Sequence, residues 1–147
     1  MEIKDYVLKR KQELKNAMLS SPRIPTLAII VVGDNPASDS YVRGKMKDAA
    51  EVGFKAVDTR LGENTSEAEL VALIKKYNAD PSIDGILVQL PVPKQISEKA
   101  IHEAVLPSKD VDGFSPLSPF ECCTPKGICD YLSAEGFVFR GKNAVVL

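Results

Sequence analysis

A tyrosine and a lysine stand four residues apart, at Tyr41 and Lys45, in the segment SDSYVRGKMK that spans residues 38–47. Residues four apart lie on one face of an α-helix, so the phenol ring and the amine point the same way. The ring offers a flat surface on which a planar ligand can stack. A lysine that is partly desolvated beside such a ring gives up its proton more readily than a lysine in water. The pair therefore predicts a binding surface that also carries a proton-exchanging group.

The residues before this pair predict its place in the fold. Residues 26–32 form an apolar run typical of a buried strand, and residues 33–36 form the turn that leaves it. A helix over residues 38–52 follows, with Ser38 as its predicted N-cap and Gly53 as its C-terminal stop. Open α/β sheets bind ligands beyond the carboxyl ends of their strands, which is where the first turns of this helix lie.

The rest of the chain continues the alternation of strands and helices. A capping-box pair, Ser66 and Glu69, opens one helix, and the apolar segment 86–88 suits a strand covered on both faces. These patterns predict a three-layer α/β domain with a mostly parallel sheet, alternating helices and right-handed crossovers. The further predicted elements are helices over 2–19, 66–78, 96–105 and 124–134, strands over 55–60, 83–90 and 141–147, and a loop over 107–119. The helix near residue 124 is expected to begin by a cap-then-proline rule, with Thr124 as its cap.

Two more polar residues are expected to join the tyrosine and the lysine. Gln89 ends the most apolar strand, and Asp112 lies in the loop KDVDG at residues 109–113. Taken singly, Gln89 is a strand-end hydrogen bonder, Asp112 a turn aspartate and Lys45 a solvated helix residue. Taken together, they predict a cleft in which a few polar groups converge among apolar ones. The amide would orient the lysine, and the carboxylate would accept paired N–H bonds from a heterocycle.

Composition excludes several classes of function. With 19 basic and 20 acidic residues among 147, the net charge of −1 leaves no excess to neutralise phosphates, so we expect no nucleic-acid partner. Neither an apolar run of membrane-spanning length nor a secretory leader is visible, and we expect a cytoplasmic protein without a membrane partner. Three cysteines, two of them adjacent, suit reduced thiols that pack against their neighbours. No metal site is expected, because the one histidine, His102, is predicted to lie on the surface of an exposed helix.

Five segments together carry a family resemblance. In this order and spacing, the chain closely resembles the bifunctional methylenetetrahydrofolate dehydrogenase/methenyltetrahydrofolate cyclohydrolase family over nearly its whole length. The segments are 32–47, 67–80, GILVQLP at 85–91, KDVDG at 109–113 and CTPKG at 123–127.

The resemblance implies a role for each polar residue of the expected cleft. Lys45 matches the catalytic lysine, which is needed above all for the cyclohydrolase step, and Gln89 matches the glutamine that hydrogen-bonds it. Tyr41 matches the tyrosine that stacks on the folate. Asp112 matches the aspartate that anchors the pterin ring.

The resemblance also implies the reaction. Family members oxidise 5,10-methylenetetrahydrofolate to the methenyl cation with NADP or NAD and hydrolyse that cation to 10-formyltetrahydrofolate, as homodimers that serve purine biosynthesis. Val88 and Leu90 match positions that line the folate cleft. Residues 1–137 would form the folate-binding catalytic domain, and residues 138–147 the linker and first strand of a dinucleotide-binding domain.

The cofactor is where this sequence departs from the family. The chain contains no G-x-G-x-x-G motif, so we expect no cofactor-binding residue in it and, for the chain alone, no dehydrogenase activity. One alternative is a non-enzymatic remnant that binds folate or dimerises. Another is a flavodoxin-like phospho-receiver, which requires an aspartate at the end of the third strand, where this chain has Gln89.

Overall fold

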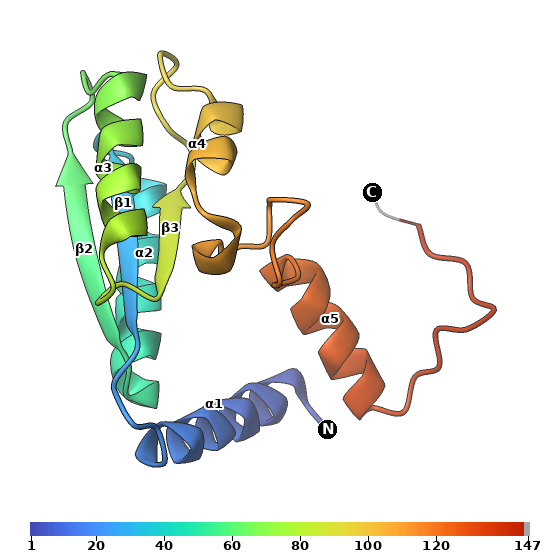
Figure 1. Ribbon diagram of the computed structural model, residues 1–147. Helices are drawn as coiled ribbons and strands as arrows, with labels where there is room; N and C mark the ends of the chain where they lie inside the picture. Colours follow the sequence, from blue (N-terminus) through green and yellow to red (C-terminus); the bar gives the residue numbers. More distant parts are fainter. Residues whose placement is uncertain (146–147) are drawn as a thin grey trace.

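The computed structural model describes residues 1–145, and its centre is a parallel sheet of three strands (Figure 1). The strands are β1 (Thr26–Val32), β2 (Lys55–Leu61) and β3 (Gly85–Gln89), in the spatial order β2-β1-β3. Ile29, in the middle of β1, lies between Asp58 of β2 and Leu87 of β3. The predicted α/β architecture with a parallel sheet is confirmed.

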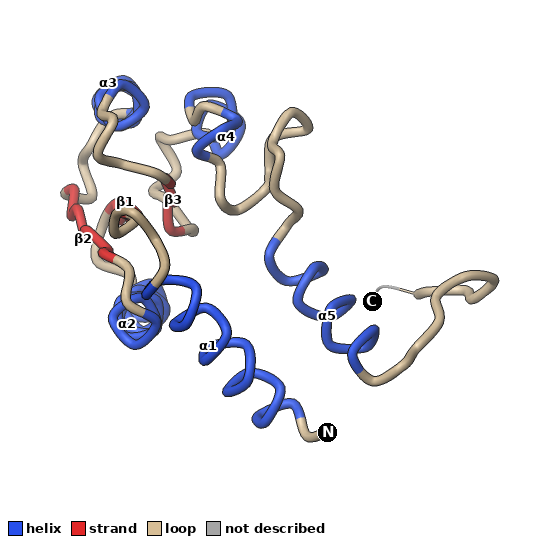
Figure 2. The backbone as a smooth tube through the Cα atoms, turned by 60° about the horizontal axis from the view of Figure 1, so that its bottom comes forward, coloured by secondary structure: helices blue, strands red, loops and turns tan. Residues whose placement is uncertain are grey.

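Helices cover both faces of the sheet, as Figure 2 shows. α2 (Pro36–Val52) covers one face, and α3 (Glu67–Ala79) and α4 (Glu98–Ala104) cover the other. Because side chains alternate along a strand, β1 and β3 each supply residues to two separate core clusters. The cluster under α2 contains Ile29, Val31, Val42 and Leu87; the cluster under α3 and α4 contains Ala28, Ile30, Val32, Leu70, Ile74, Ile83, Ile86, Val88, Ile96, Ile101 and Val105.

The first turn of α2 begins two residues earlier than the sequence predicts. Asn35 is the N-cap: its side chain accepts hydrogen bonds from the backbone N–H groups of Ala37 at 2.9 Å and Ser38 at 3.3 Å. Pro36 then fills the first helical position, where a missing N–H costs nothing. The prediction that Ser38 caps the helix is therefore wrong. Its hydroxyl is buried and has no hydrogen-bond partner among the described residues.

The expected end of α2 and start of α3 are confirmed, whereas α4 covers only Glu98–Ala104 of the helix predicted over 96–105. Ser66 and Glu69 form the expected capping box, in which the Glu69 carboxylate accepts from the Ser66 N–H at 2.8 Å. Gly53 ends α2 in the left-handed region, with φ at 94°, which a residue bearing a Cβ rarely adopts.

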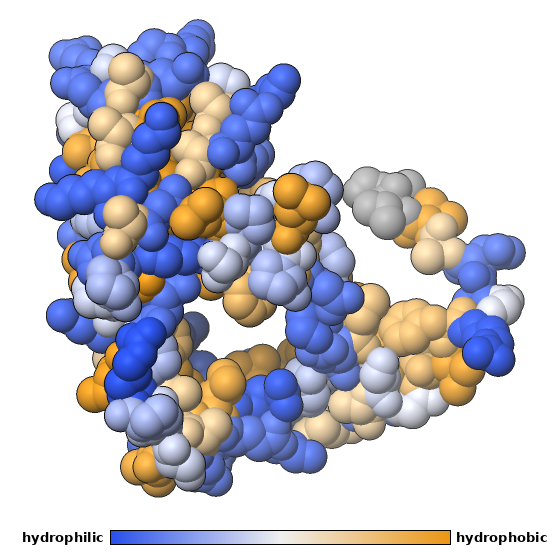
Figure 3. Space-filling model, viewed as in Figure 1, coloured by the Kyte–Doolittle hydropathy of each residue, from blue (hydrophilic) through white to orange (hydrophobic). Residues whose placement is uncertain are grey.

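Two helices lie outside the sheet domain. α1 (Ile3–Leu19) docks on α2 through Lys11, whose amine contacts Asp48 at 2.7 Å and Glu51 at 2.8 Å. α5 (Cys123–Ala134) meets the start of α1, where the Tyr6 and Tyr131 rings pack edge to face with centroids 5.4 Å apart. Neither helix contains a buried residue. Figure 3 shows apolar side chains over α5 and the segment after it, and a hollow framed by α1, α5 and the sheet domain.

The start of α5 differs from the prediction. Its N-cap is Cys122, not Thr124, and the Cys122 side chain makes no capping hydrogen bond. Proline fits anywhere in the first turn, because the N–H groups there have no partner within the helix. The sequence rule that places proline directly after the cap therefore misplaced the boundary by two residues.

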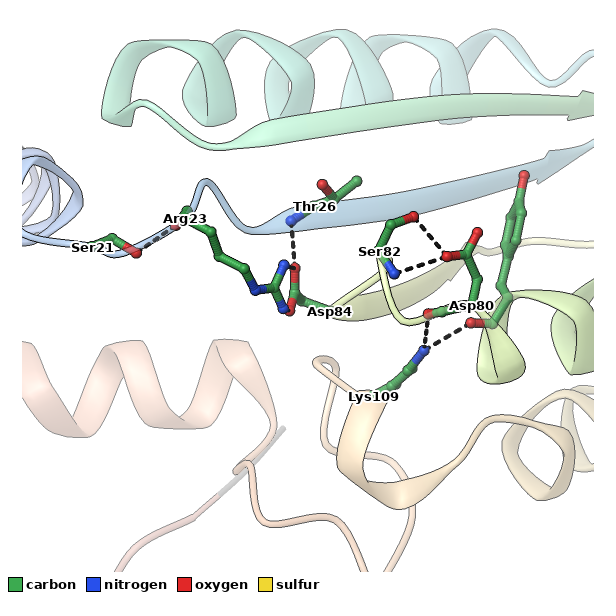
Figure 4. Close-up of polar contacts among 8 residues, drawn as sticks. Ser21, Arg23, Thr26, Asp80, Ser82, Asp84 and Lys109 are labelled. Atoms are coloured by element: carbon green, nitrogen blue, oxygen red, sulfur yellow. Dashed lines mark hydrogen bonds and ion pairs between the residues drawn. The ribbon is translucent and has the colours of Figure 1, made fainter.

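A group of polar contacts lies at the end of the sheet where β1 and β3 begin (Figure 4). The Asp84 carboxylate accepts the Thr26 N–H at 2.8 Å and pairs with the Arg23 guanidinium, which ties β3 to the start of β1. The Lys109 amine donates to the carbonyls of Tyr77 at 2.9 Å and Asp80 at 2.7 Å. Lys109 ends the short 3-10 helix η1 (Pro107–Lys109), so these bonds anchor the loop that follows it to the end of α3.

The predicted strand over residues 141–147 is not formed in residues 141–145, and residues 146–147 lie outside the described part. A strand needs a neighbour to accept its hydrogen bonds, and Figure 1 shows this segment away from the sheet. In residues 1–145, the helices are too short or too polar to cross a bilayer.

Two leucine-to-alanine substitutions should differ in their effect on stability, because one residue lies in the packed core and the other on an exposed helix. Leu70 is fully buried, with 0% exposure, whereas Leu8 on α1 is 61% exposed. Leu70→Ala should lower the free energy of unfolding by about 2–5 kcal/mol, because it leaves a cavity. Leu8→Ala should change it by less than about 0.5 kcal/mol. Urea denaturation measures both, and equal midpoints for the two variants would contradict this division of the molecule.

Candidate functional site

A lysine and a glutamine meet at the carboxyl end of the sheet. The Lys45 amine donates a hydrogen bond to Oε1 of Gln89 at 2.9 Å. Lys45 lies on the inner face of α2, on the same side as the buried residues Val42 and Ala49. The amide nitrogen of Gln89 donates to the Leu90 carbonyl at 2.8 Å, which fixes the side-chain oxygen toward the lysine. Both side chains are half-buried, so the contact is held in place but remains open to a ligand.

This contact lies in an open pocket of about 690 Å³ between α1, α2, β3 and the start of α5. The structure brings Tyr41, Lys45, Gln89 and Asp112 together in its wall. The pocket is mainly apolar, with a few polar groups, which is the usual composition of a small-molecule site. The residues that line it are Lys11, Leu14, Leu27, Tyr41, Lys45, Asp48, Ala49, Val52, Phe54, Leu87, Gln89, Val111, Asp112, Cys123 and Thr124.

Strand alternation separates two further predicted site residues from this pocket. Leu87 and Gln89 point toward α2, so Val88 and Leu90 point toward α3 and α4. Val88 and Leu90 instead line a small cavity on that side, which also touches Asp112. Their side chains therefore do not share the wall that holds Lys45, and their assignment to the folate cleft stays a prediction.

Tyr41 presents its ring at the mouth of the pocket. It is 67% exposed, one helical turn before Lys45. An aromatic ring that is exposed in the free protein and borders a pocket can be covered by a planar ligand with little rearrangement.

The loop that carries Asp112 is fixed by its neighbour Asp110. The Asp110 carboxylate is buried and accepts the backbone N–H groups of Gly113 at 3.1 Å and Ser115 at 2.8 Å. A backbone bridge pairs Asp110 with Ile86 of β3. The loop therefore lies alongside β3, an outer strand of the sheet. The sequence analysis did not identify this role of Asp110; its signal was the pattern Asp-Val-Asp at residues 110–112.

The carboxyl group of Asp112 lies in an environment that disfavours its charge. Burial raises the pKa of the Asp112 carboxyl above its ordinary value of 3.8, the Lys45 ammonium lowers it, and the Asp110 carboxylate raises it further. Within residues 1–145, no protein group donates a hydrogen bond to this carboxylate. An acceptor without a protein partner beside a pocket is available to the N–H groups of a ligand.

Two residues, His102 and Cys123, lie in surroundings that differ from those predicted. His102 is not a solvated surface residue: it is half-buried, and its ring packs on Phe114 with centroids 4.8 Å apart. The short helix α4 turns this side chain under the loop that follows Gly113, which helical spacing alone does not reveal. Cys123 lines the main pocket, and partial burial and the Asp112 carboxylate raise the pKa of its thiol.

Comparison with known proteins gives a consistent result. Residues 1–112 match the family model described as the tetrahydrofolate dehydrogenase/cyclohydrolase catalytic domain. The bifunctional protein FolD of Halothermothrix orenii is 45% identical over 93% of this chain and 52% of its own length.

Solved structures agree with the sequence match. The crystal structure of the bifunctional enzyme FolD from Campylobacter jejuni, a methylenetetrahydrofolate dehydrogenase/cyclohydrolase, superposes with a TM-score of 0.84 at 43% identity, over 88% of this chain and 50% of that one. The corresponding Trypanosoma brucei enzyme, solved with NADP and an inhibitor, gives a TM-score of 0.82 at 28% identity, over 90% of this chain and 50% of that one. The chain therefore spans about half the length of the relatives that it matches.

Removing the charge of Lys45 should change the pKa of the Asp112 carboxyl. Because the Lys45 ammonium lowers the pKa of the Asp112 carboxyl, Lys45→Met should raise that pKa further. Lys47→Met is the matched control, since Lys47 is exposed on the same helix. NMR titration of the Asp112 side-chain carbon measures both variants, and an unchanged titration in Lys45→Met would refute the coupling.

The raised pKa of the Asp112 carboxyl also affects the stability of the fold. A carboxyl whose pKa is higher in the folded than in the unfolded state favours folding below the unfolded value of 3.8, and this benefit is lost as pH rises through the folded value. Asp112→Asn, which cannot ionise, should therefore unfold at higher denaturant concentration than the parent protein at pH 7. The difference should shrink as pH falls toward 3. A difference that is independent of pH would contradict the burial of this charge.

Proposed function

The chain belongs to the tetrahydrofolate dehydrogenase/cyclohydrolase family, and we propose that it supplies the folate-binding catalytic half of a bifunctional one-carbon enzyme. In this proposal, 5,10-methylenetetrahydrofolate is oxidised to the methenyl cation, which is then hydrolysed to 10-formyltetrahydrofolate. The observation that carries the proposal is the 2.9 Å hydrogen bond between Lys45 and Gln89 in a pocket that also contains Tyr41 and Asp112.

Binding would use two residues of the pocket wall. The Tyr41 ring would stack on the planar part of the folate, and the Asp112 carboxylate would accept N–H groups of the pterin. Two such contacts hold the methylene carbon at one position above the sheet edge. Oxidation by hydride transfer depends mainly on this kind of fixed geometry.

Hydrolysis would use the lysine and the glutamine. Water that attacks the methenyl carbon must lose a proton, and the ring nitrogen that leaves must gain one. Lys45 lies on the pocket wall and is the group proposed to move these protons. Gln89, whose own orientation is fixed by the Leu90 carbonyl, would keep the amine pointed at the reacting carbon.

The hydride acceptor would be NADP or NAD, which supplies the oxidising power of the first step. No residue pattern in this sequence fits a dinucleotide, because it has no G-x-G-x-x-G turn. We therefore assign the cofactor no contact in this chain. The proposed division keeps residues 1–137 as the folate-binding domain and gives residues 138–147 to the connection with a dinucleotide-binding domain.

From the family resemblance we further propose a cytoplasmic location, a homodimeric assembly and a role in purine biosynthesis.

The lysine substitution tests the proposed chemistry. In a protein that joins this chain to the C-terminal half of the Halothermothrix orenii relative, Lys45→Met should lower the rate of methenyltetrahydrofolate hydrolysis about 100-fold or more, since proton transfer is lost. Hydride transfer should fall less, because it requires position and no proton shuttle. Absorbance assays follow both reactions. Lys47→Met, on the exposed side of α2, should leave both rates near those of the parent. Full hydrolysis by Lys45→Met would reject the role given to Lys45.

A further inference from the structure

Two adjacent cysteine thiols contact the loop that carries Asp112. The Cys122 thiol donates to the Gly113 carbonyl at 3.1 Å, and the Cys123 thiol donates to the Val111 carbonyl at 3.4 Å. Val111 and Gly113 are the residues on either side of Asp112. The two thiols therefore bind the backbone just before and just after this carboxylate.

We propose that Cys122 and Cys123 are positioning residues that hold the Asp112 carboxylate in the pocket by binding the carbonyls of its two neighbours. The part of this proposal that concerns substrate rests on the function proposed above for Asp112. The part that concerns the loop rests on the geometry alone.

Close packing supports the contact after Asp112. Gly113 has φ at 70°, and a Cβ at this position would lie 2.6 Å from the Glu121 carbonyl carbon and 2.7 Å from the Cys122 nitrogen. The backbone of the Gly113 turn thus lies directly against the backbone of residues 120–122. The Cys122 hydrogen bond lies across this contact and fixes the two segments relative to each other.

The contact before Asp112 has a counterpart on the sheet. A Cβ at Gly85 would lie 2.6 Å from a methyl group of Val111, so the absence of a side chain at the start of β3 lets Val111 pack there. The Asp110 carboxylate accepts the Gly113 and Ser115 amides, and the Asp110 backbone bridges to Ile86 of β3. The loop is therefore fixed to the sheet by its own residues and to the start of α5 by the two thiols.

The surroundings of the two cysteines suit this role. A thiol donates a hydrogen bond only while it carries its proton, and burial together with the nearby Asp112 carboxylate raises the pKa of the Cys123 thiol. Cys122 occupies the N-cap position of α5, yet its side chain makes no capping bond and binds Gly113 instead. The side chain at this helix start thus serves the loop and not the helix.

The experiment compares three variants of the 147-residue chain. Cys122→Ala/Cys123→Ala removes both donors, and Cys122→Ser/Cys123→Ser replaces each thiol with a hydroxyl donor. Cys129→Ala is the matched control, because this third cysteine is exposed on α5 at a position beyond its first turn. Circular dichroism verifies folding. If the double alanine variant does not fold, the single substitutions Cys122→Ala and Cys123→Ala replace it.

Two measurements separate the loop from the ligand. Amide hydrogen exchange at Gly113 and Ser115, without ligand, should be about tenfold faster in the double alanine variant, because two hydrogen bonds to the loop are lost. The dissociation constant of 5-formyltetrahydrofolate, a stable folate, should rise about tenfold by calorimetry. The single alanine variants should each show about threefold effects. The serine variant should stay within about twofold of the parent in both measurements, and Cys129→Ala should match the parent.

The outcomes decide between the two parts of the proposal. Parental exchange rates in the alanine variants, or a serine variant that behaves like the alanine variant, would overturn the positioning role of the thiols. Faster exchange with an unchanged dissociation constant would overturn the link to substrate. If the parent chain itself binds no folate, the proposed function fails, and the exchange rates still test the thiols independently.

Discussion

The hydrogen bond between Lys45 and Gln89 depends on the pairing of β1 with β3. α2 starts from the end of β1, and Gln89 ends β3, which lies directly beside β1 in parallel. Parallel pairing brings the carboxyl ends of both strands to the same end of the sheet, so Lys45, in the third turn of α2, can reach the residue that ends β3. If β3 were antiparallel to β1, Gln89 would lie at the opposite end of the sheet, away from Lys45.

The direction of each side chain along β3 is the second constraint. A shift of one residue in register would turn Gln89 toward α3 and bring Val88 under α2. The buried residues on both faces oppose such a shift, since Leu87 packs under α2 and Ile86 packs under α3. The same burial that stabilises the sheet thus selects which residue can reach Lys45.

Much of this arrangement could be predicted from the sequence, because it follows from patterns that are local. The three strands, the capping box at Ser66 and the convergence of Tyr41, Lys45 and Gln89 at one sheet edge need only periodicity and chain order. The errors concern contacts between distant segments or a choice between similar neighbours. Asn35 and Ser38 are both good N-caps, and only the backbone decides between them.

The contacts that fix Asp112 are of the non-local kind. The thiols that reach its loop lie about ten residues further along the chain, and the surroundings of His102 depend on how α4 packs. Sequence reasoning treated the cysteines as packing residues because no histidine was placed beside them. It had no means to show that their protons point at two specific carbonyls.

The choice of an amide as the partner of Lys45 follows from the charges of the pocket. A carboxylate at position 89 would orient the amine equally well, but it would form an ion pair with it. It would also add a negative charge to a pocket that already contains Asp112, whose own ionisation is disfavoured by burial. The Gln89 oxygen accepts one hydrogen bond at 2.9 Å and adds no net charge. Gln89 therefore holds the Lys45 amine in position without adding a charge to the pocket.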